Sequence, residues 1–455
     1  MIRVCDAIMS SGKSSACINY MNEHPDRKFI YITPYLSEAA RIQKACPALN
    51  FVEPEDGYMK VEDEYGIEIW NKKKFEWRTK TQHTAKLIAE GCNITTTHQA
   101  FVYYTPDMLE AIRQQHYTLI VDEDVQAMSK YDIFKTDLDV LVKSGHLIEE
   151  DGEIRVGKQI PDGPSSFSGI FKTLESRNLI RIKSGGNKVE TVFWTLPPDL
   201  FLAFDDVFIL TYLFEGQSLS VMFQLAGIEY ENIGIRKDED GYHFDPEGTY
   251  QPPYVRSLAN KIHICKKPKF NREGTNIYAL SQNWLKNHLP ERGKLRNHLL
   301  SFFRNDRHAP SSRTMWTTFK NQKRFLQGKG YTKGFVPLNQ KATNEYSDRI
   351  YLGYMANLYL NPAFKIYYNS KGIEFNERLY ALSNMIQWIF RSAIRNGDEI
   401  WIYIPSRRMR ELLQDWIRDL ALGGTGRESV CAAEEEGEDE FDEEYEDDDD
   451  YEDEE

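Results

Sequence analysis

The residues Ile2-Arg3-Val4-Cys5-Asp6-Ala7, followed closely by Met9-Ser10-Ser11-Gly12-Lys13-Ser14-Ser15, decide the fold class of this chain. The first run is a short apolar segment that predicts a strand, and the residues from Ala16 to Met21 can begin a helix after the loop. Between them, Ala7 to Ser14 matches the phosphate-binding pattern GxxxxGK[ST], with Ala in place of the first Gly. The order strand, loop, helix therefore predicts a nucleotide-binding loop.

Each residue type in this loop has a role in holding phosphate. Gly12 lets the backbone approach the anion, Lys13 can reach the β and γ phosphates, and Ser14 can ligate Mg²⁺. The helix that follows presents its N-terminus to the same anion. We therefore expect ATP and Mg²⁺ as ligands, with nucleotide contacts from Ser10, Ser11, Gly12, Lys13, Ser14 and Ser15.

A second apolar run, Leu119-Ile120-Val121, ends in the two carboxylates Asp122 and Glu123. This arrangement places Asp122 with Ser14 on the Mg²⁺ shell and Glu123 beside an attacking water. Alone, a strand that ends in acidic residues is an ordinary solvated turn. Together with a phosphate loop in the same sheet, it favours a hydrolytic site in which Lys13, Asp122 and Glu123 are catalytic.

Short apolar strands alternate with helical patterns through most of the chain, which predicts an α/β protein with parallel sheets. Residues 130–195 break that rhythm: a helix over 168–176 and a hairpin over 179–194 predict a winged-helix-like insertion or a plain surface excursion. The Gly-, Asp- and Pro-rich stretch 238–253 is the expected linker. Further strands are expected at 29–32, 117–121, 207–211, 261–265, 314–318 and 399–404, and further helices at 37–45, 379–395 and 408–420.

The length of 455 residues is enough for two or three domains. We expect a first domain over 1–240 with an insertion at about 130–200, a second over 254–422, and a disordered acidic tail over 423–455. No run is long and apolar enough to span a bilayer and no signal peptide is evident, so a cytoplasmic location is expected. The six cysteines show no CxxC pairing, which favours free thiols.

The charge is distributed unevenly. The formal net charge is −14, but 18 of the 22 residues from Glu434 to Glu455 are acidic, and the rest of the chain has 56 basic against 52 acidic residues. Between Arg256 and Lys333 there are 18 Lys or Arg residues and only three acidic ones. Such a patch fits a nucleic acid, although a solvated basic surface is the alternative. The tail is either a solvating appendage or a nucleic-acid mimic that docks on this patch or on a partner protein.

These motifs resemble those of superfamily 2 helicases, in the same order along the chain. The phosphate loop resembles motif I, and motifs Ia, Ib, II and III are matched by Thr33-Pro34, Thr95-Thr96-Thr97-His98-Gln99, Asp122-Glu123-Asp124 and Leu210-Thr211. The resemblance implies two tandem RecA-like domains, with ATP in the cleft between them and a nucleic-acid strand across both. It is strong for motifs I and II, and the chain looks most like helicase-like proteins of tailed bacteriophages.

The second half resembles the family more loosely. Met315 to Lys320 lies where motif IV is expected, Lys341 to Tyr346 where motif V is expected, and Gln387 to Arg395 resembles motif VI. On one helix Gln387, Arg391 and Arg395 would share a face, so two guanidinium groups could reach one γ-phosphate. The motif departs from the family at Phe390 and at the second arginine, so either arginine or both can be the ATP contact. No upstream glutamine element that reads adenine precedes Ile2, so we expect no strict selectivity for ATP.

The resemblance implies a helicase or translocase that hydrolyses ATP and acts on DNA in replication, recombination or repair, with RNA as an alternative track. The expected nucleic-acid contacts, which hold phosphate without reading sequence, are Thr33, Pro34, Thr96, Thr97, Thr317, Thr318, Lys320, Thr343 and Asn344. Aromatic residues in the basic stretch can stack on bases, although most are expected in the core. Two other functions remain open: a terminase-like packaging ATPase, and a nucleic-acid clamp without strand separation.

Overall fold

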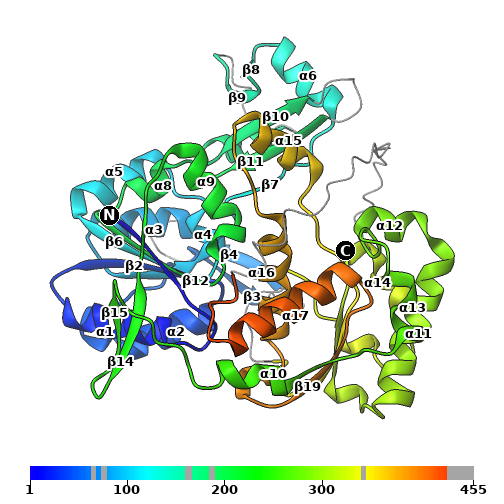
Figure 1. Ribbon diagram of the computed structural model, residues 1–455. Helices are drawn as coiled ribbons and strands as arrows, with labels where there is room; N and C mark the ends of the chain where they lie inside the picture. The colour runs from blue at the N-terminus through cyan, green and yellow to red at the C-terminus, as the bar shows by residue number, and fades with distance from the viewer. Residues whose placement is uncertain (63–67, 73–78, 159–166, 184–189, 340–344, 428–455) are drawn as a thin grey trace.

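A computed structural model describes residues 1–62, 68–72, 79–158, 167–183, 190–339 and 345–427. Two α/β lobes lie side by side, and a smaller antiparallel sheet projects from the first (Figure 1). Among the helices of these ranges, none combines the length and apolar character that a bilayer span requires. Five of the cysteines are free thiols, as predicted, and Cys431 lies outside the described residues.

The first lobe is built on a six-stranded parallel sheet with the order β13-β1-β12-β6-β2-β5. All six residues of β6 are buried, because helices cover a parallel sheet on both faces. Helices α1 and α2 pack on one face, and α3, α5 and α9 pack on the other. The strands are β1 (Ile2–Asp6), β2 (Lys28–Thr33), β5 (Ile94–Thr97), β6 (Tyr117–Asp122), β12 (Asp206–Thr211) and β13 (Glu231–Asn232). The helices are α1 (Lys13–Glu23), α2 (Leu36–Ala45), α3 (Lys80–Ala89), α4 (His98–Phe101), α5 (Pro106–Gln115), α8 (Asp199–Leu202) and α9 (Ser218–Ala226).

The insertion is a five-stranded antiparallel sheet in the order β7-β11-β10-β9-β8. The predicted helix and hairpin are present as α7 (Ser168–Leu174), β10 (Asn178–Lys183) and β11 (Glu190–Thr195), with the turn 184–189 outside the described residues. The winged-helix interpretation is wrong, because three further strands extend the hairpin into a sheet. These strands are β7 (Met128–Lys130), β8 (Leu147–Glu150) and β9 (Glu153–Val156), with α6 (Lys135–Lys143) beside them.

The first half of the stretch predicted as a linker, 238–253, instead belongs to a hairpin made by β14 (Gly234–Asp238) and β15 (Gly241–Asp245), while residues 246–253 form no helix or strand and lead to the second lobe. The hairpin packs on α1, where the Asn19 side-chain amide donates to the backbone carbonyl of Tyr242 over 3.0 Å. Phe244 stacks on Phe208 with ring centres 5.1 Å apart. The hairpin was not predicted because the surrounding Gly, Asp and Pro residues obscured the alternation of Tyr242 and Phe244 along the strand.

The second lobe contains a four-stranded parallel sheet in the order β16-β19-β18-β17. With the sheet of the first lobe, it confirms the predicted fold class of two α/β units with parallel sheets. The strands are β16 (Ile262–Ile264), β17 (Thr314–Thr317), β18 (Tyr351–Tyr354) and β19 (Ile400–Tyr403). The helices are α10 (Leu258–Lys261), α11 (Pro268–Asn271), α12 (Gln282–Asn287), α13 (Leu289–Ser301), α14 (Lys323–Leu326), α15 (Pro362–Ser370), α16 (Glu377–Ile389) and α17 (Arg407–Ala421).

The helix predicted over 379–395 ends early. Helix α16 stops at Ile389, and Ser392 is fully extended with φ −83° and ψ −173°. There the amide of Ala393 donates to the carbonyl of Arg349 over 2.9 Å, so the chain exchanges helical hydrogen bonds for a contact with a neighbouring segment. Arg395 lies in a separate 3₁₀ turn. Gln387, Arg391 and Arg395 therefore do not share one helix face, contrary to the expectation.

The two lobes are joined by a shared apolar core and by contacts of the C-terminal segment 425–427. Ile8, from the phosphate loop, packs into the core cluster of the second lobe. The indole of Trp416 donates to the Tyr212 hydroxyl over 2.8 Å, and that hydroxyl donates to the carbonyl of Thr425. Arg427 then forms an ion pair with Asp6 at the end of β1. The chain thus returns to the edge of the nucleotide loop before the acidic tail begins.

Helix α15 of the second lobe also contacts the insertion (Figure 1). Phe193 of β11 lies edge-on to Phe364 and Tyr367, with ring centres 5.2 and 5.1 Å away. These rings and the neighbouring apolar side chains form a separate buried cluster. The insertion is therefore held by both lobes instead of projecting freely from the first.

Candidate nucleotide site and nucleic-acid surface

The phosphate loop bends sharply between β1 and α1. Ser10 and Gly12 both have positive φ, 58° and 94°, which turns the backbone so that α1 begins at Lys13. A Cβ atom at Gly12 would overlap the Tyr242 ring, so glycine is required there for space as well as for conformation. Ser11 is buried, and its hydroxyl has no hydrogen-bond partner within the described ranges. Ser10 and Ser15 are exposed.

Lys13 folds back over its own loop. Its ammonium group donates to the carbonyls of Ala7 and Ile8, the second over 3.1 Å. Burial lowers the pKa of Lys13, and the nearby charges of Asp122 and Glu123 partly oppose this shift. An amine held by loop carbonyls and facing two carboxylates is placed to turn toward a phosphate group bound in the loop.

Asp122 is tied to the loop and to the sheet. Its carboxylate accepts from the Ser14 hydroxyl over 3.4 Å and from the Tyr31 hydroxyl over 2.8 Å. The imidazole of His98 lies 2.8 Å from the carbonyl of Asp122. Burial raises the pKa of Asp122, while the bond from Tyr31 opposes that rise. Ser14 and Asp122 together offer a hydroxyl and a carboxylate oxygen, the hard ligands that Mg²⁺ prefers.

Glu123 stands at the strained end of β6. Its φ is +68°, a conformation uncommon for residues other than glycine, and its amide donates to the carbonyl of Leu210 over 3.0 Å. Strain of this kind costs about 1–3 kcal/mol and concentrates at functional sites. The turn separates the direction of the Glu123 side chain from that of Asp122.

Arg391 comes from the second lobe and is only 5% exposed. Its Nε and Nη1 atoms have no hydrogen-bond partner among the described residues. Burial lowers the pKa of Arg391 to about 10, and the charge of Glu123 partly opposes that shift. A buried guanidinium group with unsatisfied N–H donors is unusual, because such donors cost free energy unless a ligand accepts from them.

The other two residues of the expected motif VI lie differently. Gln387 remains on α16, and its amide donates to the Ser383 hydroxyl over 3.4 Å. Arg395 is exposed on the 3₁₀ turn. Of the two arginines left open by the sequence, Arg391 is the one brought toward Glu123.

The threonines expected to contact nucleic acid in the first lobe meet at one sheet edge. Thr33 ends β2 and pairs in register with Thr97 of β5, and Pro34 follows directly. Thr33 is buried, and its hydroxyl has no partner within the described part of the chain. Thr96 and Thr97 line a cavity of about 350 Å³ together with Lys80. The hydroxyl groups and the ammonium group of this cavity suit a phosphate backbone, and the Glu53 carboxylate also lines it.

Two of the corresponding residues of the second lobe are as buried as Thr33 and Thr96. Thr317 and Thr318 are buried, and the Thr318 hydroxyl donates to the carbonyl of Met355 over 3.0 Å. Lys320 is exposed on the same side of the strand end. Thr343 and Asn344 lie outside the described residues.

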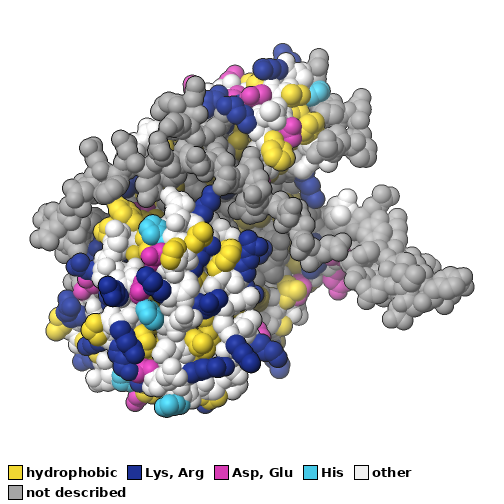
Figure 2. Space-filling model, turned by 90° about the vertical axis from the view of Figure 1, so that its right-hand side faces the viewer, with side chains coloured by type: hydrophobic (Ala, Val, Ile, Leu, Met, Phe, Trp, Pro, Cys, Tyr) yellow, Lys and Arg dark blue, Asp and Glu magenta, His cyan; other side chains and the backbone are white. Residues whose placement is uncertain are grey.

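The basic stretch forms an exposed surface on α11–α14 and the segments that join them. Figure 2 shows this lobe from the side, with Lys and Arg side chains spread across it and few acidic ones between. We call it the basic surface; its exposed members include Lys266, Lys269, Arg272, Lys286, Lys294, Arg296, Arg304, Lys320, Arg324, Lys329 and Lys333. Most of the aromatic residues in the stretch, including Phe270, Phe302 and Trp316, are buried as expected.

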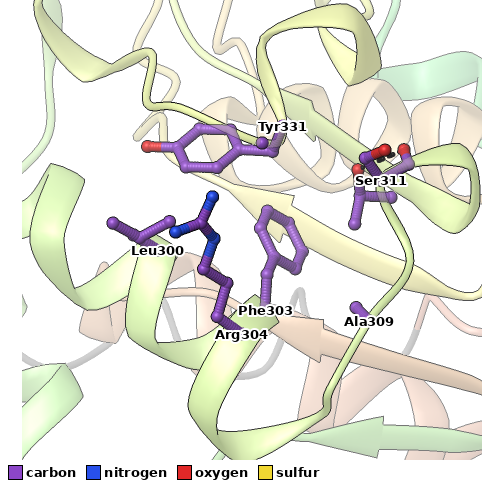
Figure 3. A pocket seen from close by; sticks show the side chains of 8 residues that line it. Leu300, Phe303, Arg304, Ala309, Ser311 and Tyr331 are labelled. Carbon is purple, nitrogen blue, oxygen red and sulfur yellow. Dashed lines mark hydrogen bonds between the residues drawn. The ribbon is translucent and has the colours of Figure 1, made fainter.

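A cavity of about 220 Å³ opens within the basic surface. Arg304 reaches into it between Leu300, Phe303 and Tyr331, with Ser311 on the opposite side (Figure 3). It lies on the second lobe and is lined by none of the predicted nucleotide contacts.

Several residues of the site were not found from the sequence. Tyr31 lies in an apolar strand pattern, so its hydroxyl bond to Asp122 gave no signal. Gln217 bonds the hydroxyl of Thr211 through its side chain, with Nε2 to Oγ1 at 2.7 Å, after a turn that the pattern did not resolve. His98 directly follows the three threonines of the Thr-rich motif, and this position is the signal that the sequence gives for it.

Comparisons with known proteins match the chain to one protein and to one domain family. Over 425 residues it is 39% identical to the SPbeta prophage-derived protein YonV of Bacillus subtilis (strain 168), covering 92% of this chain and 99% of that protein. Residues 256–417 match the model of the YonV C-terminal Rossmann-like domain.

Solved structures give weaker matches. An XPD helicase aligns with a TM-score of 0.44 at 10% identity, over 93% of this chain and 95% of that chain. Xpd4 of S. tokodaii aligns with the same score at 11% identity, over 94% of this chain and 95% of that chain. Similarity of this degree does not establish a shared activity, and the residues described above are the basis for a proposed function.

Proposed function

The chain belongs to the family of the prophage-derived protein YonV, and we propose that it is a phage helicase or translocase of superfamily 2 that hydrolyses ATP while it acts on DNA. One observation carries the proposal: the buried Arg391 of the second lobe has N–H donors without a partner among the described residues, and its charge interacts with that of Glu123 at the end of β6. A site completed by residues of two lobes can link hydrolysis to movement of one lobe against the other.

The residues present fit ATP with Mg²⁺. The loop supplies the N-terminus of α1 and the Lys13 ammonium group for phosphates. Ser14 and Asp122 would hold Mg²⁺, which neutralises phosphate charge when bound. The unsatisfied N–H groups of Arg391 provide donors for an anion. Two positively charged side chains and a metal-binding pair would thus act on one nucleotide.

Each group has a task in hydrolysis. Lys13 leaves the carbonyls of its own loop and binds the β and γ phosphates. Glu123 orients the attacking water and accepts its proton. Arg391 donates to the γ-phosphate oxygens, where charge grows in the transition state. Tyr31 keeps the Asp122 carboxylate in place through its hydroxyl bond. Arg395 is exposed and has no part in this step.

The nucleic acid is proposed to cross both lobes. Thr33, Pro34, Thr96 and Thr97 contact its backbone on the first lobe, and Lys320 and the basic surface do so on the second. Contacts of this kind hold phosphates without reading sequence. Four further residues remain proposed contacts. Thr317 and Thr318 are buried, and Thr343 and Asn344 lie outside the described residues. The acidic residues of the tail would compete for the same surface or bind a partner protein.

Hydrolysis of ATP by the purified chain tests the enzymatic part. The wild type is compared with Glu123→Gln, which keeps the size of the side chain and removes its basicity, and with Lys13→Ala. We expect Mg²⁺-dependent hydrolysis by the wild type and a loss of two orders of magnitude or more in both variants. Equal rates in wild type and Glu123→Gln would show that the activity comes from elsewhere.

A further inference from the structure

The β14–β15 hairpin places an aromatic ring directly on the phosphate loop. The Tyr242 ring lies against Gly12 so closely that a Cβ atom there would overlap it. The strand is held on α1 by the bond from Asn19 to the Tyr242 carbonyl. The Tyr242 side chain nevertheless stays only half-buried. A large ring is therefore fixed at the loop with part of its surface open to solvent.

Two further side chains gather around this ring. The Tyr250 ring lies edge-on to it, with ring centres 5.8 Å apart and planes at 72°. The Lys237 ammonium group lies 5.0 Å from the centre of the Tyr242 ring and 5.7 Å from that of Tyr250. A hydrogen bond with Tyr242 raises the pKa of Lys237, so the lysine stays charged. We call Tyr242, Tyr250 and Lys237 the tyrosine cluster.

Packing of the hairpin does not depend on this cluster alone. Phe244, two residues along the same strand, stacks on Phe208 and approaches Tyr20 inside the core of the first lobe. The apolar attachment of the hairpin is shared by Phe244, the buried Ile235 and the rings of Tyr242 and Tyr250. Tyr242 continues the same row of side chains toward the loop, where it meets Gly12 at the end of the phosphate site.

We propose that the tyrosine cluster binds the base of the nucleoside triphosphate, with a purine ring stacked on Tyr242. The inference rests on the proposed nucleotide site, because the loop must hold the phosphates for the base to reach the ring. Base–aromatic stacking is tolerant of base identity, since every base has a π-face. Lys237 adds a donor for the ring nitrogens of a purine. The cluster therefore accepts both ATP and GTP.

Calorimetric binding in the presence of Mg²⁺ separates the base from the phosphates. ATP probes the loop and the tyrosine cluster together, whereas inorganic tripolyphosphate probes the loop alone. We expect Tyr242→Leu to weaken ATP and GTP binding by about tenfold, the loss of one base stack, and to leave tripolyphosphate binding within twofold. Tyr242→Phe, which keeps the ring, is expected to bind ATP like the wild type. Phe244→Leu is the matched control for disturbed hairpin packing, with unchanged affinity for ATP.

The possible results separate this inference from the proposed function. If Tyr242→Leu weakens ATP and tripolyphosphate equally, the ring only supports the loop and the inference is overturned. Unchanged ATP binding in Tyr242→Leu, or the same loss in Phe244→Leu, overturns it too. Base-dependent ATP binding without hydrolysis would refute the enzymatic proposal and leave the base site standing, whereas a wild type that binds neither ligand refutes both.

Discussion

Replacement of Arg391 by Met should have two effects. It should stabilise the nucleotide-free protein, and it should abolish ATP hydrolysis. Met fills a similar volume without charge or N–H donors. Burial lowers the pKa of Arg391 to about 10, which corresponds to about 3 kcal/mol against the charged form at this position. Replacement of buried charged groups by apolar ones is often stabilising by about 1–4 kcal/mol. We expect a gain of about 1–3 kcal/mol in the free energy of unfolding.

The catalytic effect has the opposite sign. Arginine donors to a transferring phosphoryl group are worth about 10³–10⁵ in kcat. Arg391→Met should therefore lower kcat for ATP hydrolysis by about three orders of magnitude or more. Arg395→Met is the matched control, because Arg395 is exposed and lies in the next turn. It should change neither kcat nor stability beyond about 0.5 kcal/mol.

Two measurements check this pair of effects: urea unfolding of the nucleotide-free variants, and steady-state ATP hydrolysis. A stable Arg391→Met protein with near-normal kcat would refute the placement of Arg391 at the γ-phosphate. Loss of more than 1 kcal/mol of stability would show that the guanidinium group makes net favourable contacts in the nucleotide-free protein. Loss of activity in Arg395→Met alone would transfer the role to that residue.

Three further changes probe neighbouring parts of the structure. Tyr31→Phe removes the hydroxyl bond to Asp122. In a Mg²⁺ titration of ATP hydrolysis, the Mg²⁺ concentration that gives half of the maximal rate should rise by about tenfold or more. An unchanged concentration would mean that the bond does not orient the carboxylate. Asp122→Asn should raise the melting temperature of the nucleotide-free protein at neutral pH, because burial raises the pKa of that carboxyl and its charged form is disfavoured in the folded state. The gain in melting temperature should vanish as the pH falls below the pKa of the carboxyl in the unfolded chain. A gain that does not depend on pH would contradict this cause. Truncation after Arg427 keeps its ion pair with Asp6 but removes the acidic residues, and DNA affinity at low salt, measured by fluorescence anisotropy, should rise; equal affinity would show that the tail does not compete.

Much of the first lobe was predictable because its signals are local. The loop pattern around Lys13 and the carboxylates after Val121 each lie within one strand and its following turn. Parallel strands bring such turns to the same sheet edge, so the pairing of Ser14 with Asp122 follows from the topology. The bond from Tyr31 did not follow, because a tyrosine in a buried strand looks the same whether its hydroxyl is used or not.

The second lobe was less predictable because its decisive contacts are not local. Helix α16 ends at Ile389 owing to the bond between Ala393 and the distant Arg349, which no periodicity in 379–395 reveals. The hairpin mistaken for a linker depends on contacts of Tyr242 and Phe244 with α1 and β12, more than thirty residues away. Residue type predicted which side chains can do chemistry, and tertiary contacts decided which of them meet.

Stimulation of ATP hydrolysis by nucleic acid is the most direct test of the proposed motor. Hydrolysis is measured alone and with single-stranded DNA, duplex DNA and RNA, each beside Glu123→Gln. If the chain couples the nucleotide site to a track, at least one nucleic acid raises the rate several-fold, and the variant loses that rate. A rate that no nucleic acid changes would contradict the assignment as a helicase or translocase and leave a nucleotide hydrolase without a track.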